Sequence, residues 1–223
     1  YVRGHAMDYD QWQEKGARDW GYRHCLPYFK KADDWVFGSD DYRNQGGPLS
    51  VNNGNNMQNP LYRAFIEAGA QAGYMKTDDY NGRQQEGFGP MHMTVKNGGR
   101  WSTANAYLKP ALQRPNLKVI TGALSQRILL DGKRATGVEF LRDGSKQLVS
   151  ARREVILSAG PIASPHLLQL SGIGPGVVLQ QAGIDVVHDL PGVGSNLQDH
   201  LDLFVIAECT GDHTYDGVAK LHR

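Results

Sequence analysis

Hydrophobic positions change their spacing near residue 116. Beyond this point the apolar residues come in short runs separated by turn signals, the pattern of successive β-strands. The DG pairs at 131–132 and 143–144 are hairpin turn signals between such runs. We therefore expect strands at LKVIT (117–121), LSQRILLD (124–131), KRATGVEFL (133–141), KQLVSA (146–151) and REVILSAG (153–160).

The last of these runs ends in a glycine- and proline-rich stretch, SAGPIASPHLLQLSGIGPG at 158–176. VILSAG is continuously apolar, as a buried parallel strand should be. Ser164 is suited to cap a helix whose first residue is Pro165, and Gly172 and Gly174 to end it. Two interpretations stay open: the stretch is purely structural, or its small residues also let a cofactor approach the backbone. The leucines expected in the core are Leu167, Leu168 and Leu170.

Helical spacing precedes residue 116. Asn59 and Pro60 are typical of a helix start, and Gly73 of its end. Ser102 is a plausible N-cap for a second helix that should stop before or at Pro110. A shorter helix is expected around CLPYFKKADDW (25–35), with the proline in its first turn, and another in GVVLQQAG (176–183), followed by an extended piece, IDVVHDLP (184–191).

The first 60 residues are otherwise loop-rich and dense in aromatic side chains. Glycines and Asn/Asp clusters interrupt them, which indicates irregular structure. We expect a packed lid face here; an aromatic cage for a quaternary ammonium group is the less favoured alternative. The aromatic residues are Tyr1, Tyr9, Trp12, Trp20, Tyr22, Tyr28, Trp35 and Tyr42.

Composition narrows the functional classes. The 223 residues carry 24 Lys+Arg against 23 Asp+Glu, so no strong field favours nucleic acid or an anionic membrane. Two cysteines, distant in sequence, argue against a disulfide framework and favour a reducing compartment. No apolar run is long enough for a transmembrane helix, and no signal peptide is recognisable. The chain opens on YVRG without methionine and ends on VAKLHR, so we expect a fragment of a longer protein.

Two other chemistries lack their residue patterns. The eight histidines are scattered, and no pair has metal-ligand spacing with cysteine or carboxylate support, so we expect no metal site. No Gly-x-Ser-x-Gly elbow is present, which argues against serine hydrolase chemistry.

Four stretches, in order and with matching spacing, resemble the glucose–methanol–choline (GMC) oxidoreductase family. A fifth, DDYNGRQQEGFGPM (78–91), is similar to the branch of bacterial choline dehydrogenases and FAD-dependent alcohol dehydrogenases. Pro161 stands where the family usually has alanine. The four stretches are YVRGHAMDYDQW (1–12), GRWSTANAYL (99–108), AGPIASPHLLQLSGIG (159–174) and LPGVGSNLQDH (190–200).

The resemblance implies an α/β (α+β) chain: part of an FAD/NAD(P)-binding-type fold, with a three-stranded antiparallel meander and a loop-rich aromatic N-terminal lid. It also implies three regions. Residues 1–98 would form the lid and an extension of the FAD domain, residues 99–200 part of the FAD-binding domain, and residues 201–223 the start of the substrate-binding domain.

The resemblance places cofactor contacts at five residues. Ala159 and Gly160 would face the adenosine half of FAD through their backbone. Ser125 would contact the adenine, or be simply an exposed strand residue. Arg3 and Gly4 follow the loop that covers the flavin, where Arg3 would hold a phosphate or an internal carboxylate.

A second group of residues is expected at the border between flavin and substrate domains. The group comprises Asn196, Gln198, Asp199 and His200. The alternative for this group is a turn capped by Asn196, with local hydrogen bonds at Asp199 and His200.

The implied activity is oxidation of a primary alcohol, choline-like or broader, by hydride transfer to FAD. The family's pyrophosphate-binding glycine motif would lie before Tyr1, and its catalytic His–His or His–Asn pair beyond Arg223, so the chain alone is expected to be inactive. The implied electron acceptor is a quinone, another respiratory carrier or oxygen. A non-catalytic nucleotide-binding or scaffold domain of the same fold is the alternative. We expect a cytoplasmic protein, with a location peripheral to the inner membrane as an alternative, and leave oligomerisation open.

Overall fold

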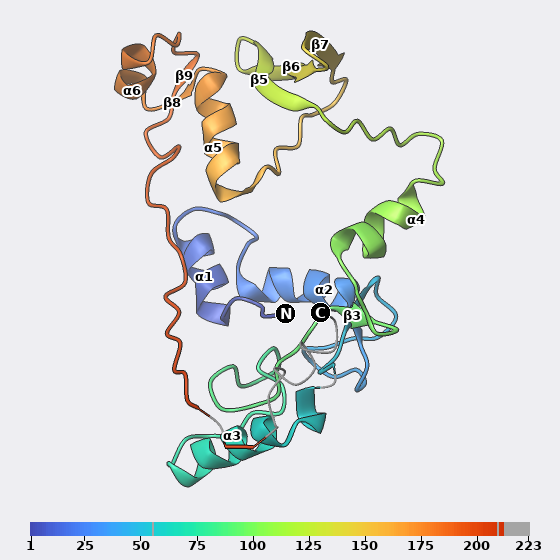
Figure 1. Cartoon of the computed structure of the whole chain (residues 1–223). Helices are drawn as coiled ribbons and strands as arrows, with labels where there is room; N and C mark the ends of the chain where they lie inside the picture. Colours follow the sequence, from blue (N-terminus) through green and yellow to red (C-terminus); the bar gives the residue numbers. More distant parts are fainter. Residues whose placement is uncertain (55, 209, 212–223) are drawn as a thin grey trace. The chain divides into compact units, whose positions relative to one another are not determined.

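The computed structural model describes residues 1–54, 56–208 and 210–211 (Figure 1). The chain divides into two compact units. The first contains residues 1–118 and the described residues from 206 onward, and the second contains residues 119–205. Residues 209 and 212–223, which belong to the predicted start of a substrate domain, lie outside the described residues. They include Cys209, His213 and His222. The mixture of helices and strands agrees with the expected fold class.

The first unit combines short helices with two small sheets. β1 and β2 pair in parallel, and β3 and β4 pair antiparallel. Its elements are α1 (Ala6–Glu14), α2 (Tyr22–Ala32), β1 (Asp33–Trp35), β2 (Leu49–Val51), η1 (Asn56–Gln58), α3 (Pro60–Gln71), β3 (Val95–Lys96), β4 (Gly99–Arg100), η2 (Ala104–Leu108) and α4 (Lys109–Ala111).

The helix α1 was not expected from the sequence. It begins with a reciprocal cap: the His5 Nδ1 accepts from the Met7 N–H at 3.2 Å, and the Asp8 carboxylate accepts from the His5 N–H at 2.7 Å. Histidine is an uncommon cap, and α1 contains no buried residue, so neither a typical start signal nor an apolar stripe marks it.

The helix α2 corrects the expected place of Pro27. The helix starts at Tyr22, so the proline lies in its interior and not in its first turn. The start is set by a tertiary contact, since the Asp10 carboxylate of α1 accepts from the Tyr22 N–H at 2.9 Å. A cap supplied from another helix leaves no signal next to the helix that it caps.

The helix α3 forms as predicted. The Asn59 side chain accepts from the Leu61 N–H at 2.9 Å, and Gly73 follows the helix with φ of 90°. The next helix does not stop at Pro110, which is a second correction. The π-helical turn η2 precedes it: the Lys109 N–H bonds the Ala104 carbonyl, and α4 then carries the chain through the proline.

The second unit is built on an antiparallel meander, as expected. It comprises β5 (Leu124–Asp131), β6 (Arg134–Arg142) and β7 (Ser145–Ser150), in the order β5-β6-β7. The turns use Gly132 at φ 55°, and Asp143 and Gly144 at φ 50° and 74°, so both DG signals mark left-handed turn residues.

Two predicted strands are absent from segments that the structure describes completely. Residues 117–121 and 155–158 form neither helix nor strand. A strand needs a neighbour to take its N–H and C=O groups, and no described segment pairs with these two. Their apolar residues remain partly exposed; Ile156 keeps 78% of its surface in solvent.

The rest of the second unit is α5 (Gly160–Leu170), β8 (Ile173–Gly174), α6 (Gly176–Gln181) and β9 (His188–Asp189), with β8 and β9 parallel. The expected start of α5 was wrong. The helix begins at Gly160 with Pro161, a residue suited to the first turn, and Pro165 lies within it. The Ser164 hydroxyl accepts from the Ala159 N–H at 3.1 Å. Leu170 is 40% exposed, so the expectation that it lies in the core is also wrong, whereas Gly172 ends the helix as predicted.

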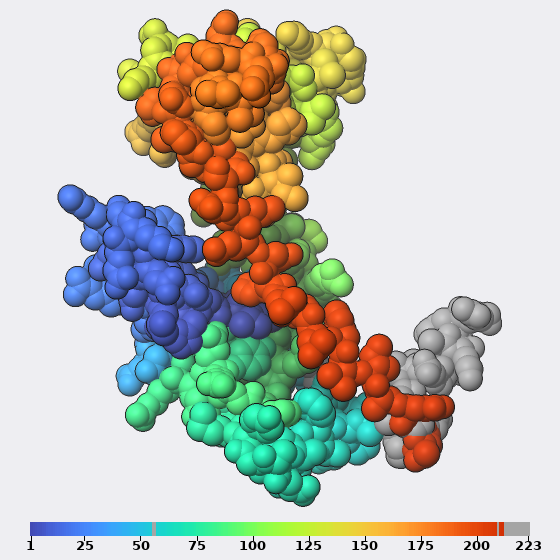
Figure 2. Space-filling model, turned by 90° about the vertical axis from the view of Figure 1, so that its left-hand side faces the viewer, coloured from blue at the N-terminus to red at the C-terminus, as the bar shows by residue number. Residues whose placement is uncertain are grey.

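A run of apolar residues follows the second unit's last turn. Residues 195–208 form no helix or strand, and Figure 2 shows the orange-to-red part of the chain as an extended strip. Leu201, Leu203, Phe204, Val205 and Ile206 are each more than 80% exposed. In the described part of the chain, no helix has the length and apolar character needed to cross a membrane.

Candidate functional site

The predicted cofactor contacts are divided between the two units. Arg3 and Gly4 lie in the first, whereas Ser125, Ala159 and Gly160 lie in the second. The border group, Asn196 to His200, also lies in the second.

In the first unit, Arg3 is paired with an internal carboxylate. Its side chain is buried, and Nη2 lies 3.0 Å from the Asp33 Oδ2. Nη1 donates to the Tyr42 carbonyl at 2.7 Å. Of the two partners weighed from the sequence, the structure places a carboxylate beside the guanidinium; a contact with the cofactor stays a prediction.

Asp33 is shared by a second buried arginine. The Arg43 Nε lies 3.0 Å from the same Asp33 oxygen, and neither side chain is exposed. Burial raises the pKa of the Asp33 carboxyl, and the Arg43 and Arg3 guanidiniums oppose that rise. The Arg43 guanidinium also stacks over the Trp35 ring at 4.1 Å. One carboxylate thus compensates two buried cations, with Asp79 at 3.7 Å from Arg43 as a further partner.

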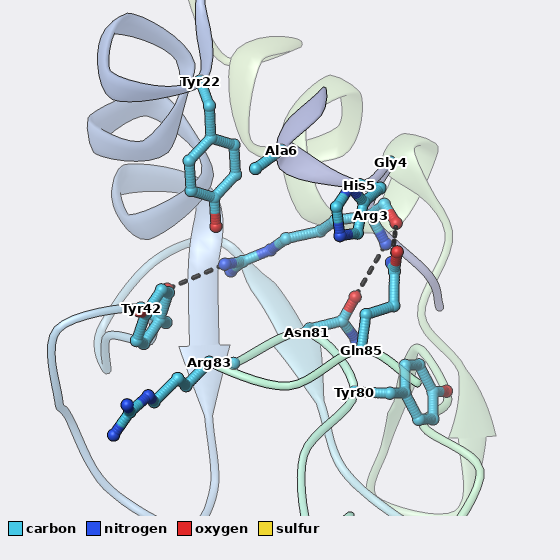
Figure 3. A pocket seen from close by; sticks show the side chains of 11 residues that line it. Arg3, Gly4, His5, Ala6, Tyr22, Tyr42, Tyr80, Asn81, Arg83 and Gln85 are labelled. Atoms are coloured by element: carbon cyan, nitrogen blue, oxygen red, sulfur yellow. Dashed lines mark hydrogen bonds between the residues drawn. The ribbon is translucent and has the colours of Figure 1, made fainter. Parts of the chain in front are cut away.

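The segment around Arg3 is held by side-chain amides from far along the chain (Figure 3). The Asn81 Oδ1 accepts from the Arg3 N–H at 2.7 Å, and its Nδ2 donates to the Tyr1 carbonyl at 3.1 Å. The Gln85 Nε2 donates to the Arg3 carbonyl at 2.8 Å. These amides take the place of a neighbouring strand and fix an extended segment next to Gly4.

His92 completes this network as a neutral group. Its Nδ1 lies 3.0 Å from the Asn81 Nδ2, and its ring stacks on Tyr80 with centroids 4.3 Å apart. Burial lowers the pKa of His92 from 6.5 to about 4, although the nearby Asp79 raises it. At neutral pH the ring is therefore an uncharged acceptor, which suits it to hold Asn81 rather than to transfer protons.

A small polar cavity of about 140 Å³ opens beside this segment. Figure 3 shows the Asn81 and Gln85 side chains reaching the Arg3–Gly4 segment, and the Arg83 side chain pointing away from it. The cavity is too small for a flavin. Its complete lining is Arg3, Gly4, His5, Ala6, Tyr22, Tyr42, Tyr80, Asn81, Gly82, Arg83 and Gln85.

In the second unit, Ala159 and Gly160 form an open start to α5. Gly160 has φ of 90°, and a Cβ built there would meet no atom within 4 Å. Both residues are exposed, although the Ala159 N–H already donates to the Ser164 hydroxyl at 3.1 Å. The unhindered backbone at Gly160 is compatible with close approach of the adenosine half of a dinucleotide.

Ser125 lies on β5 opposite Phe140 and is exposed. A register irregularity follows it, between Ser125 and Arg127, which bends the strand locally. Its position on an exposed strand is compatible with both interpretations drawn from the sequence. Contact with adenine stays a prediction.

The border group forms no cluster among the described residues. Asn196 adopts φ of 55°, and the His200 N–H bonds its neighbour, the Asp199 carboxylate, at 2.9 Å. Asn196, Gln198, Asp199 and His200 are exposed. A groove of about 320 Å³ runs beside α5 and is lined by Pro161, Ile162, Pro165, His166, Gln169, Gly194, Ser195 and Leu197.

Several residues of the network were not singled out from the sequence. Asp33, Arg43 and His92 carried no motif, and Asn81 and Gln85 lay in the stretch 78–91, which indicated a branch of the family but no role for these two side chains. A buried pair is recognisable only when its partner is known. Within the described residues, no group of three His, Cys, Asp or Glu side chains is placed to hold a metal ion.

Comparison with known families gives a match over most of the chain. The model of a family described as GMC oxidoreductase matches residues 1–202. An oxygen-dependent choline dehydrogenase of Photobacterium profundum is 60% identical over 210 residues, which are 94% of this chain and 37% of that protein. Proteins of the same description from Vibrio vulnificus and Brucella anthropi are 59% and 56% identical over 97% and 94% of the chain. The chain thus spans less than two-fifths of the length of these relatives.

Solved structures agree with this match. Pyridoxine 4-oxidase from Mesorbium loti superposes with a TM-score of 0.79 at 36% identity, over 86% of this chain and 38% of that one. A formate oxidase variant from Aspergillus oryzae RIB40 has a TM-score of 0.80 at 27% identity, over 90% and 36%. An FAD-dependent oxidoreductase from Chaetomium thermophilum has a TM-score of 0.74 at 28% identity, over 89% and 37%.

Proposed function

Because the chain belongs to the GMC oxidoreductase family, we propose that it forms part of an FAD-dependent enzyme that oxidises a primary alcohol. The family match and the solved neighbours confirm FAD as the cofactor. The observation that carries the proposed reaction is the 60% identity to an oxygen-dependent choline dehydrogenase, over 94% of the chain. It supports choline as the substrate and oxygen as an electron acceptor, with a quinone or another respiratory carrier as the alternative acceptor.

The chain's own residues would serve binding and positioning. When bound, FAD supplies a two-electron acceptor for hydride from the alcohol carbon. Ala159 and Gly160 are exposed and would leave the backbone open for close approach of the adenosine half. The Asn81 and Gln85 amides would keep the Arg3–Gly4 segment rigid beside the cofactor.

The catalytic base is proposed to lie outside this chain. His92, the most buried histidine among the described residues, is held neutral by burial and accepts from Asn81, so it is unsuited to take a substrate proton. We therefore expect the 223-residue chain alone to show no turnover. We also propose a cytoplasmic location, with a location peripheral to the membrane as the alternative. This location and the state of oligomerisation are to be measured on the complete protein.

Anaerobic addition of choline to the complete purified protein tests the proposal. We expect the visible flavin absorbance to bleach, and an equal concentration of a trimethylammonium compound without a hydroxyl to leave it unchanged. Bleaching by other primary alcohols but not by choline would move the substrate to the broader class. A protein that retains flavin but responds to no alcohol would favour a non-catalytic nucleotide-binding domain, and a protein without flavin would contradict both.

A further inference from the structure

The residue that ends α5, Ser171, carries two hydrogen bonds in the interior of the second unit. Its hydroxyl donates to the Leu167 carbonyl at 2.6 Å and accepts from the Ile128 N–H at 2.8 Å. Ser171 is 8% exposed and Ile128 is 7% exposed. The hydroxyl therefore joins the end of a helix to a strand through two buried residues, and a buried N–H is costly to leave without an acceptor.

The strand needs this acceptor because of its place in the sheet. β5 is an edge strand, so alternate N–H groups along it have no strand on their outer side. Ile128 lies between two register irregularities, one at Ser125/Arg127 and one at Leu129/Leu130, where the pairing with β6 is already disturbed. Ser171 supplies the acceptor that a neighbouring strand would supply elsewhere. Among the described residues, no other hydrogen bond joins α5 or its cap to the sheet.

The C-terminal end of α5 also makes backbone contacts with residues 185–188. Gly172 has φ of 82°, and its carbonyl accepts from the Val187 and His188 N–H groups at 2.8 and 3.0 Å. A Cβ built on Gly172 would lie 2.5 Å from the Asp185 carbonyl oxygen. The end of α5 is thus held by backbone contacts on one side and by a single hydroxyl on the other.

We propose that Ser171 is a positioning residue for the adenosine half of FAD, an inference that rests on the function proposed above. Ser125 lies three residues before Ile128 on β5, and Gly160 opens the helix that Ser171 closes. α5 has eleven residues and is therefore a rigid helix about 16 Å long. A small change where Ser171 pins its end therefore displaces the Ala159–Gly160 backbone relative to Ser125, and with it the two walls expected to receive the adenosine.

Substitution at Ser171 tests this in the complete protein after removal of FAD. Ser171→Ala leaves the buried Ile128 N–H without an acceptor, and we expect the arrangement that binds to become a minor population. The dissociation constants of FAD and of AMP, which carries only the adenosine half, should then rise by the same factor, about tenfold. Ser171→Thr keeps the hydroxyl and should restore both constants to within about twofold of the parent value.

Thr136→Ala provides the matched control. The Thr136 hydroxyl bonds the Leu129 carbonyl at 3.1 Å, next to Ile128 on the same strand, but makes no bond to α5. This variant should leave the FAD and AMP constants within about twofold of the parent. If Ser171→Ala yields no folded apoprotein, Ser171→Cys, with a weaker acceptor of similar size, should weaken FAD and AMP together by a smaller factor.

Three results would overturn the inference. One is a Ser171→Ala protein that melts at a lower temperature but binds AMP with the parent's constant while folded, which is a purely structural effect. Another is weakening of FAD without weakening of AMP, and a third is failure of Ser171→Thr to restore binding. Failure of the proposed function would give a different result. A parent protein that binds FAD and AMP, but whose flavin is not reduced by alcohols, would contradict the proposed reaction and leave the inference about Ser171 intact.

Discussion

The two units of this chain are stabilised in different ways. The second is organised by sequence-local hairpins and an apolar centre, with Glu139 and Ser171 as its buried polar side chains among the described residues. The first is organised around charges and amides from distant segments: Arg3, Asp33, Arg43, Asn81 and His92 are all buried. Local hairpins tolerate changes elsewhere, whereas a buried charge network fails when one member is removed. The difference teaches that the region predicted to border the flavin depends on long-range polar contacts.

The largest expected effect is the loss of Asp33. Asp33→Ala leaves the Arg3 and Arg43 guanidiniums buried without their shared carboxylate, and should destabilise the protein by about 3–5 kcal/mol. Chemical denaturation measures the change, and hydrogen exchange should show faster opening in residues 1–118 than in residues 119–205. Glu67→Ala is the control, because its pair with Lys76 is exposed and worth no more than about 1 kcal/mol. A loss of under about 1 kcal/mol for Asp33→Ala would remove the contrast between the units.

The second unit should respond to a change of apolar volume. Phe140 is 6% exposed on β6, the central strand, and Phe140→Ala should cost about 3 kcal/mol through lost burial and a residual cavity. Hydrogen exchange should now be faster in residues 119–205. Phe140→Leu, which retains most of the apolar volume, should cost less than half as much. Equal opening of both units in either variant would show that they unfold together.

The first unit should also be sensitive to acid. Since the pKa of His92 is about 4 in the folded protein and 6.5 when unperturbed, the unfolded chain binds more protons between these values, and stability falls as pH falls through this window. The groups facing His92 are the Asp79 carboxylate, which favours its protonation, and the Arg43 guanidinium and Tyr1 amino group, which oppose it; Tyr80 stacks on it. Between pH 7 and 5 we expect a loss of about 1–2 kcal/mol from this residue.

The matched variant is His92→Gln, whose side-chain oxygen can accept from Asn81 but does not titrate in this range. Denaturation midpoints at pH 7, 6 and 5 measure the difference. The variant should be less stable than the parent at pH 7 but lose less of its stability on acidification. Parallel pH profiles for the two proteins would count against a buried neutral His92.

The smallest effect is expected at a hairpin turn of the second unit. Gly144 has φ of 74°, where a Cβ is strained, so Gly144→Ala should cost about 1 kcal/mol although open space surrounds it. Gly192→Ala is the control, since Gly192 is also in open space but not in the left-handed region. Its unfolding free energy should stay within about 0.5 kcal/mol of the parent. Similar losses of unfolding free energy in both variants would show that backbone strain is not the cause.

Prediction from the sequence succeeded where the deciding contacts are local. The DG pairs, the Asn59 cap and the glycines after α3 and α5 act within a few residues, and each marks an element end that the structure contains. Prediction failed at Pro27, Pro110 and Pro165, which lie inside helices. α2 and α5 begin earlier than the prolines suggested, and a π-helical turn precedes Pro110; the spacing of apolar residues shows neither.

The candidate site shows the same division between local features, which the sequence predicts, and long-range contacts, which it does not. Motifs were sufficient to indicate the family and FAD, because the family's stretches are contiguous in the sequence, whereas the contacts of Ala159 and Gly160 with the cofactor stay a prediction. They were not sufficient to find the support of Arg3, since its partner Asp33 lies 30 residues away and Asn81 lies 78 residues away. Hydrogen bonds require distances near 3 Å, and only the folded chain specifies which distant groups reach that distance.

The sequence by itself determined the family, the meander with its two turns and the capped helix α3, because turn geometry and capping depend on neighbouring residues. The tertiary structure alone decided that Asp33 compensates two arginines, that His92 is neutral and that Ser171 joins α5 to β5. Each of these depends on burial, which gives an unpaired charge or N–H its high cost. Burial is a property of the whole fold and not of any segment.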